Sequence, residues 1–209
     1  VVSVMEEKMN KVLYIKANPK PSNLSRTFTI SDKFIQTYKE NNPNDEIITL
    51  DLYNEQINFL TSEDIESVFG AKNETSKKHH LLKYAYQFAE ADKYIISAPM
   101  WNLSIPAILK AYIDYICVTG ITFKYTANGP VGLCQNKKAV HITTTGGDYS
   151  NESGSKFEMG NRYLTTIFNF LGITDFNTIK AEKLDIIGED VEAIINEAIS
   201  QAQDVAKKF

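Results

Sequence analysis

The stretch KVLYIKANPKPSNLSRTFTI, residues 11–30, gives the first strong indication of the fold. Its first six residues are mostly apolar and predict a buried strand, whereas the prolines and asparagines that follow predict a loop. Ser25 then stands where a helix-capping residue is expected, at the start of a predicted helix over residues 25–39. A strand, a polar loop and a helix in this order are typical of the beginning of a βαβ unit.

The same alternation continues along most of the chain. Predicted strands cover residues 46–50, 93–97, 138–143 and 175–180, and predicted helices cover residues 76–90, 106–118, 157–171 and 190–207. Two segments are less regular: residues 51–75, with one short helix near 62–69, and residues 120–130, an extended segment with a turn. Strands separated by helices predict an α/β fold, a five-stranded parallel sheet with helices on both faces. Because no linker or repeat divides residues 1–209, we expect a single domain.

Composition and charge exclude several classes of protein. Hydrophobic residues make up 43% of the 209 residues and charged residues 23%, which favours a folded core over disorder. The 22 Lys and Arg are outnumbered by 26 Asp and Glu, a net charge of −4, so we expect no nucleic-acid partner. No apolar run approaches the length of a membrane span, and residues 1–10 do not resemble a signal peptide. With only Cys117 and Cys134 present, no disulfide framework is expected, and we predict a cytoplasmic protein that does not contact membranes.

The loop after the first strand has the chemistry of an anion site. In an open parallel sheet, ligands bind beyond the carboxyl ends of the strands, where the strand order reverses. Asn18 opens this loop, and Ser25, Arg26 and Thr27 close it at the start of a helix. The free N–H groups of a helix N-terminus, two hydroxyls and a guanidinium suit a phosphate, although a simple N-cap at Ser22 or Ser25 is the alternative interpretation. Because the chain contains no dinucleotide-binding glycine motif and no P-loop motif, a single terminal phosphate fits best.

Two further loops supply a flat surface and backbone amides. The loop after the third strand contains Pro99, Met100, Trp101, Asn102 and Leu103, and its tryptophan is the only one in the chain. Trp and Met offer polarisable surface to a ring system and Asn can read the polar edge of that ring, although a core tryptophan is the alternative. The loop after the fourth strand contains Thr144, Thr145, Gly146 and Gly147, and its paired glycines let N–H groups approach a ligand closely. The three loops together predict a flavin mononucleotide (FMN) site.

Four stretches resemble one enzyme family, the FMN-dependent NADH:azoreductases and NADH:quinone oxidoreductases. They are PMWNLSIPAILKAYIDYI (residues 99–116), GITFKYTANGPVGL (120–133), ITTTGGDYS (142–150) and FLGITDF (170–176). The resemblance extends over residues 11–185 and implies a flavodoxin-like fold. It also implies a homodimer with non-covalent FMN in two sites near the interface. NADH would be the electron donor, and a quinone or an aromatic azo compound would be the acceptor, in ping-pong order.

Matching motif to motif places the family's site residues in this sequence. The resemblance assigns FMN contacts to Asn18, Ser25, Arg26, Thr27, Pro99, Met100, Trp101, Asn102, Leu103, Thr144, Thr145, Gly146 and Gly147. It assigns the substrate side of the site to Phe123, Tyr125 and Tyr149, with Phe123 and Tyr125 from the same or the partner subunit, although Phe123 and Tyr125 as plain edge-strand residues are the alternative interpretation. The chain departs from the family pattern at Asn18, Arg26, Trp101 and the Thr144-Thr145 pair.

Two other functions remain open from the sequence. A one-electron carrier of the flavodoxin type would be expected to carry long acidic patches. A phosphodiesterase acting on acyl carrier protein, the activity once ascribed to some family members, would need a metal site or a nucleophile–base pair. His79 and His80 are predicted to point in different directions from a lysine-rich helix, and His141 is predicted to be a packed strand residue. We therefore expect no metal and no catalytic side chain, because FMN would carry the chemistry.

The helix predicted over residues 106–118 is apolar on more than one face. Such a helix must be covered by its own sheet and by a second surface. A partner subunit would supply that surface, so the pattern predicts a homodimer.

Overall fold

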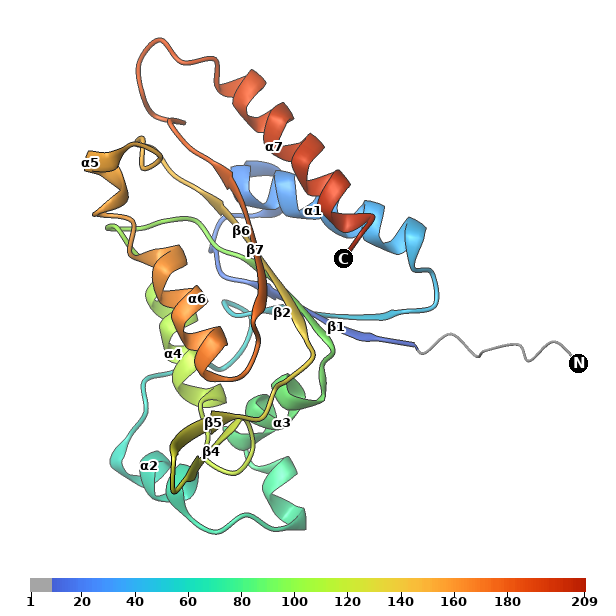
Figure 1. Ribbon diagram of the computed structural model, residues 1–209, viewed down its shortest axis with the longest axis vertical. Coiled ribbons are helices and arrows are strands. Elements are labelled where there is room, and N and C mark those ends of the chain that lie inside the picture. The colour runs from blue at the N-terminus through green and yellow to red at the C-terminus, as the bar shows by residue number, and fades with distance from the viewer. Residues whose placement is uncertain (1–8) are drawn as a thin grey trace, which may run out of the picture.

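A five-stranded parallel sheet forms the centre of the molecule (Figure 1). The computed structural model describes residues 9–209, so most of the segment on which the signal-peptide prediction rests lies outside the described residues. The strands are β1 (Lys11–Lys16), β2 (Glu46–Asp51), β3 (Lys93–Ser97), β6 (Lys138–Thr144) and β7 (Asp175–Ala181). Their order is β2-β1-β3-β6-β7, and every neighbouring pair is parallel. The predicted fold class is confirmed, and the predicted strand bounds agree with the observed ones to within one residue.

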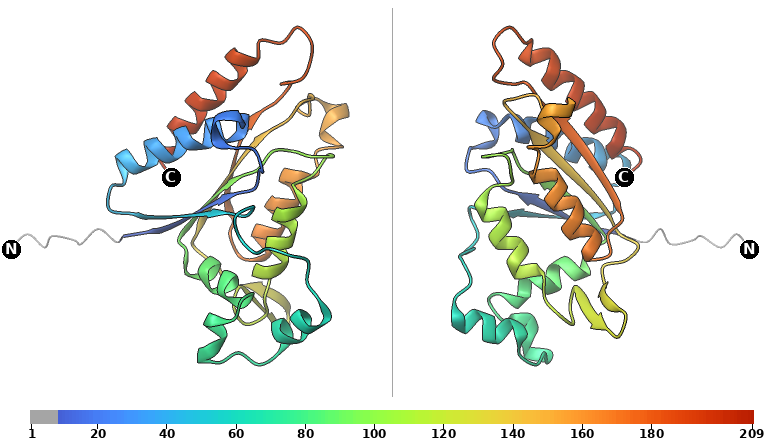
Figure 2. Two further views of the ribbon diagram at one scale, coloured as in Figure 1. Left: turned by 180° about the vertical axis from the view of Figure 1, so that it is seen from behind. Right: turned by 60° about the vertical axis from the view of Figure 1, so that its left-hand side comes forward.

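Helices cover both faces of this sheet because successive strand residues point to opposite sides. In β1, Val12 and Tyr14 contribute to one apolar core, and Leu13 and Ile15 contribute to the other. The first core lies under α1 (Arg26–Asn41) and α7 (Val191–Ala206). The second lies under α3 (Leu82–Glu90), α4 (Ala107–Ile116) and α6 (Gly160–Phe170), as Figures 1 and 2 show.

Two helices begin later than the sequence predicts. Residues 76–90 do not form one helix: a short 3₁₀ helix (Glu74–Lys78), capped by Asn73 and Ser76, ends at an extended His79, and α3 begins only at Leu82. His79 and His80 therefore do not diverge from a helix as predicted, and their rings lie with centroids 4.5 Å apart. The helix predicted from residue 157 begins as α6 at Gly160, after the short α5 (Glu152–Ser155).

The two irregular segments lie outside the sheet. Residues 51–75 contain α2 (Ser62–Phe69), at the predicted position. The segment with a predicted turn forms an antiparallel hairpin of β4 (Phe123–Thr126) and β5 (Gly129–Gly132). This hairpin connects the end of α4 to the start of β6, so it lies at the edge of the sheet where the parallel strands begin (Figure 1). The hairpin therefore lies away from the loops that follow the carboxyl ends of the strands.

The second face of α4 is covered by the chain itself. Tyr112 and Tyr115 pack against Tyr84 of α3, with ring centroids 6.1 and 5.9 Å away, and the Tyr115 hydroxyl accepts a 2.9 Å hydrogen bond from the N–H of Asn58. Lys110, on the outer face of the helix, forms an ion pair of 2.6 Å with Asp114. The apolar pattern of α4 is thus accounted for within one chain, and it does not by itself require a partner. Within the described residues, no helix has the length and apolar character needed to cross a membrane.

Candidate functional site

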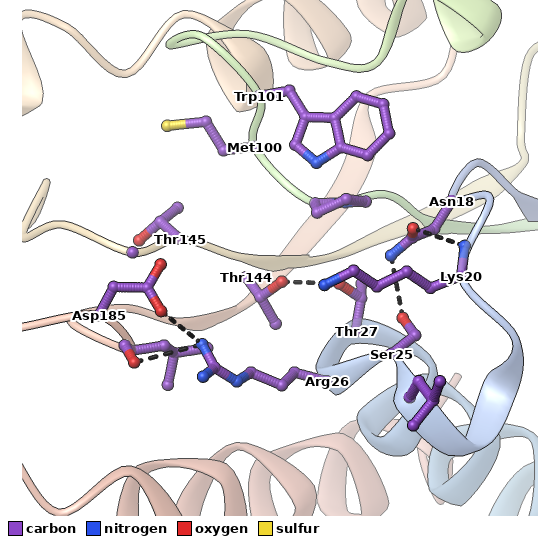
Figure 3. A pocket seen from close by; sticks show the side chains of 14 residues that line it. Asn18, Lys20, Ser25, Arg26, Thr27, Met100, Trp101, Thr144, Thr145 and Asp185 are labelled. Atoms are coloured by element: carbon purple, nitrogen blue, oxygen red, sulfur yellow. Dashed lines mark hydrogen bonds and ion pairs between the residues drawn. The ribbon is translucent and has the colours of Figure 1, made fainter.

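A pocket of about 390 Å³ opens at the carboxyl ends of β1, β3 and β6 (Figure 3). The chain leaves β1 for β2 on one side and reaches β3 on the other, so the pocket lies where the strand order reverses. The residues that line it are Asn18, Lys20, Leu24, Ser25, Arg26, Thr27, Pro99, Met100, Trp101, Thr144, Thr145, Gly146, Leu184 and Asp185. All three predicted loops therefore meet at one site.

The N-terminus of α1 forms one end of the pocket. Ser25 is the N-cap of this helix, and its Oγ accepts hydrogen bonds from the N–H of Phe28 (3.2 Å) and from Nδ2 of Asn18 (3.0 Å). Because both contacts use lone pairs, the Ser25 hydroxyl proton can be donated to a ligand. The N–H groups of Arg26 and Thr27 have no partner within the helix, as is usual for its first turn. Ser25 is thus an N-cap and a donor to an anion site at once, and the two interpretations of the sequence are compatible.

Two threonine hydroxyls join this helix to the sheet. Thr27 Oγ1 and Thr144 Oγ1 lie 2.6 Å apart, and both side chains are buried. A single proton suffices for this hydrogen bond, so the second hydroxyl proton can be donated elsewhere. The contact fixes the first turn of α1 against the end of β6.

A tight turn carries the aromatic side of the pocket. Trp101 and Ser104 exchange two backbone hydrogen bonds of 2.8 and 3.0 Å, which leaves Asn102 (φ 47°) and Leu103 (φ 69°) in the left-handed region. This conformation is uncommon for leucine and is typical of residues constrained by their surroundings. The Leu103 carbonyl accepts a 2.9 Å hydrogen bond from the N–H of Met159, which anchors the turn next to α6. Trp101 is 39% exposed, so it is a wall of the pocket and not a core residue.

The glycine loop after β6 is held by a segment that the sequence analysis missed. The N–H groups of Lys183, Leu184 and Asp185 donate to the carbonyls of Gly147, Thr145 and Gly146, at 2.9, 3.1 and 3.0 Å. This segment follows β7, whereas the predicted FMN-binding residues follow β1, β3 and β6, and its own sequence carries no glycine pair or hydroxyl cluster that would have indicated it. In the described part of the chain, the N–H groups of Gly146 and Gly147 have no hydrogen-bond acceptor. They remain available to a ligand.

Gly146 lies close to the side chain of Asp185. A Cβ placed on Gly146 would lie 2.4 Å from the Asp185 carboxylate oxygen. That carboxylate pairs with Arg26, whose Nη1 lies 2.9 Å from Asp185 Oδ1 and 3.2 Å from the carbonyl oxygen of Leu184. Figure 3 shows this pair extending along one side of the pocket. The Arg26 guanidinium is thus already bound within the chain.

Several predicted residues do not line the pocket. Asn102, Leu103 and Gly147 belong to its loops but lie beside it, and Tyr149 packs over Gly147, where its ring would be 3.2 Å from an added Cβ. Phe123 packs against Phe170 at a centroid distance of 4.8 Å and Tyr125 is 70% exposed. Both belong to the β4–β5 hairpin at the opposite edge of the sheet, so the chain does not bring them to its own pocket.

The remaining candidate residues lie apart from the pocket lining. His141 is buried in β6 as predicted, with Nδ1 3.0 Å from Asn161 Oδ1, and burial lowers its pKa. Burial raises the pKa of the Cys117 thiol to about 12 and also raises that of Cys134, which disfavours the reactive thiolate. Within residues 9–209, no group of three or more His, Cys, Asp or Glu side chains is arranged to hold a metal ion.

Comparisons with known proteins identify the family. A family described as having a flavodoxin-like fold matches residues 10–206. An FMN-dependent NADH:quinone oxidoreductase of Clostridium acetobutylicum is 67% identical over 201 residues, which are 96% of this chain and 100% of the relative. The crystal structure of an azoreductase from Bacillus anthracis superposes with a TM-score of 0.87 at 36% identity, over 96% of this chain and 100% of that chain. The crystal structure of an FMN-dependent NADH-azoreductase from Bacillus anthracis in complex with FMN also has a TM-score of 0.87, at 29% identity, over 96% of this chain and 99% of that one.

The match to the family extends over nearly the whole described chain, and the pocket lies where the fold places its ligands. The chain belongs to the flavodoxin-like family of FMN-dependent NADH:quinone oxidoreductases and NADH:azoreductases.

Proposed function

We propose that this protein is an FMN-dependent NADH oxidoreductase that reduces quinones and cleaves aromatic azo compounds. One observation carries the proposal: an anion-binding helix end, an exposed tryptophan and unpaired backbone amides border one pocket at one edge of the sheet. The names of close relatives and structural neighbours point to the same chemistry. Residues 1–209 would act as a single FMN-binding domain.

The donors of the pocket fit the parts of FMN. At the end of α1, the hydroxyls of Ser25 and Thr27 and the free N–H groups of the first turn suit a phosphate monoester. Trp101 and Met100 offer the flat, polarisable surface that an isoalloxazine ring needs. The N–H group of Gly146, which lines the pocket, suits the carbonyl-rich edge of that ring, where negative charge accumulates on reduction, and the N–H group of Gly147 lies beside it in the same loop.

The chain would supply position and electrostatics, and no catalytic side chain is proposed. FMN, when bound, supplies two-electron chemistry, because its ring can take a hydride from a nicotinamide and pass two electrons to a quinone, whereas cleavage of an azo bond to two amines takes four electrons and therefore two NADH. We infer a ping-pong order, in which the donor and the acceptor would use the same place in the pocket, next to Trp101, in turn.

We also propose that the active form is a homodimer. Large apolar side chains are exposed at Phe59 (80%), Phe69 (74%), Tyr125 (70%) and Phe157 (57%), and a second copy of the chain would remove part of this apolar surface from water. Phe123 and Tyr125 lie away from their own pocket, so in a dimer they would wall the partner's site, and Tyr149 would border the substrate side beside Gly147. The acidic net charge of −4 supports the absence of a nucleic-acid partner, and use of NADH, an intracellular metabolite, supports a cytoplasmic location.

A visible spectrum tests the proposal. The purified protein should show a flavin spectrum, or acquire one with added FMN, that bleaches with NADH in the absence of oxygen and returns when a quinone is added. A flavin that stays oxidised with NADH would favour an electron carrier instead. A protein that binds no FMN would refute the proposed function.

A further inference from the structure

Two cationic side chains line the pocket, and they differ in their contacts. Arg26 and Lys20 both belong to the lining, which contains one carboxylate, that of Asp185. A phosphate monoester carries a charge of about −1.5 to −2 at neutral pH, so a positive group that is free to pair with it would add to the N–H and hydroxyl donors of the helix end. The question is which of the two cations is free.

Arg26 is already committed to the chain. Its Nη1 donates to Asp185 Oδ1 at 2.9 Å and to the Leu184 carbonyl at 3.2 Å. The backbone of Asp185 is in turn fixed by its hydrogen bond to Gly146, at 3.0 Å, and its carboxylate lies close to the Cα of that glycine. A phosphate that drew Arg26 away would break both of its hydrogen bonds and leave Asp185 without its cation.

Lys20 has the opposite character. Its backbone N–H donates to Asn18 Oδ1 at 3.1 Å, which fixes the start of the side chain next to the buried Asn18. Asn18 also donates to Ser25, the N-cap of α1, so the lysine is anchored directly beside the anion-binding end of that helix. Figure 3 shows its side chain extending into the pocket. Within the described residues, the Lys20 ammonium has no hydrogen-bond or ion-pair partner.

We propose that Lys20 is the residue that selects the phosphate of the bound flavin, and that Arg26 and Asp185 form a bracket between α1 and the loop after β7. This inference rests on the proposed function. Pairing with a phosphate requires Lys20 to give up no contact in the described structure, whereas Arg26 would lose two. The bracket joins α1 to residues 184 and 185, which backbone hydrogen bonds hold against the glycine loop, and it contacts no phosphate, so it should support every flavin equally, with or without a phosphate.

Binding of FMN and of riboflavin, which lacks the phosphate, separates the two roles. Each flavin is titrated into the full-length, flavin-free protein, and quenching of flavin fluorescence gives the two dissociation constants. We expect Lys20→Gln to weaken FMN binding about tenfold, the size expected for one hydrogen bond between charged groups near a surface, and to leave riboflavin binding within about twofold. Lys20→Arg should retain the preference for FMN, and Lys33→Gln, at an exposed lysine on α1, is the matched control.

The double variant Arg26→Gln/Asp185→Asn removes the bracket without changing the net charge of the lining. It should weaken the binding of FMN and of riboflavin by the same factor, so the ratio of the two dissociation constants stays that of the unmodified protein. The inference is overturned if Lys20→Gln leaves the ratio of the two dissociation constants unchanged, or if the double variant abolishes the preference for FMN over riboflavin. If the unmodified protein binds FMN and reacts with NADH but fails either test, only this inference is lost. If it binds neither flavin, the proposed function is lost as well.

Discussion

Replacement of Thr27 by valine tests how the helix end is joined to the sheet. The Thr27 and Thr144 hydroxyls lie 2.6 Å apart, with side chains 1% and 8% exposed, and neither has another hydrogen-bond partner among the described residues. Valine keeps the branched shape of threonine but removes the hydroxyl. Thr27→Val therefore leaves the hydroxyl of Thr144 without a partner in a nearly closed space.

The expected loss follows from that burial. A buried polar group without a partner costs about 1–3 kcal/mol, and the pocket beside Thr144 admits water, so we expect the lower half of this range. In a chain of this size, 1 kcal/mol corresponds to a shift in Tm of roughly 2–4 °C. Thr144→Val should have a similar effect. The double variant removes both polar groups together, so its loss should be no larger than that of either single variant.

Denaturant and thermal unfolding of the flavin-free protein and its three variants give this double-mutant cycle. Thr29→Val, whose hydroxyl donates to the Ser25 carbonyl at 3.0 Å in the same helical turn, is the control that should not couple to Thr144→Val. Strictly additive losses in the Thr27/Thr144 cycle would refute the reasoning, because they would mean that the two hydroxyls do not depend on each other.

Three further predictions follow from single residues. Trp101→Ala should weaken FMN binding by about 0.5–1.5 kcal/mol, because the contact between the two rings is lost. Since the chain has one tryptophan, quenching of its fluorescence by FMN in the unmodified protein is an independent check. Tryptophan fluorescence that FMN leaves unchanged would contradict the prediction. Burial lowers the pKa of His141 below its ordinary value of about 6.5, so as the pH falls through 6.5 the unfolded chain takes up a proton that the folded chain does not, and stability decreases. Unfolding measured between pH 7 and 5 should show a shallower loss for His141→Gln; an equal slope would mean that His141 does not contribute. Gly132→Ala should destabilise the fold by about 1–3 kcal/mol, because the added Cβ would lie 2.1 Å from the backbone of Leu171. An unchanged free energy of unfolding would show that the hairpin can move away from Leu171.

Much of the fold could be predicted from local patterns. The strand over residues 11–16 is recognisable because each of its faces meets a helix layer, so its residues are apolar nearly throughout. Helix α2 was located by its sequence, and the structure shows the Thr61–Asp64 capping box at its start. The helix predicted over residues 76–90 is too long, because the apolar spacing does not reveal that the backbone is extended at His79, between a 3₁₀ helix and α3.

Tertiary structure decided what the pocket residues do. The sequence by itself determined that three loops with ligand-binding chemistry follow strands, because strand ends and turn residues are local features. It could not show that Arg26 is taken by Asp185, since 159 positions separate them and only the parallel pairing of β6 with β7 brings the second loop alongside. Nor could it place Phe123 and Tyr125 at the far edge of the sheet. Local hydrogen bonding and apolar periodicity are written along the chain, whereas the partner of an exposed charge depends on which distant loops the sheet brings together.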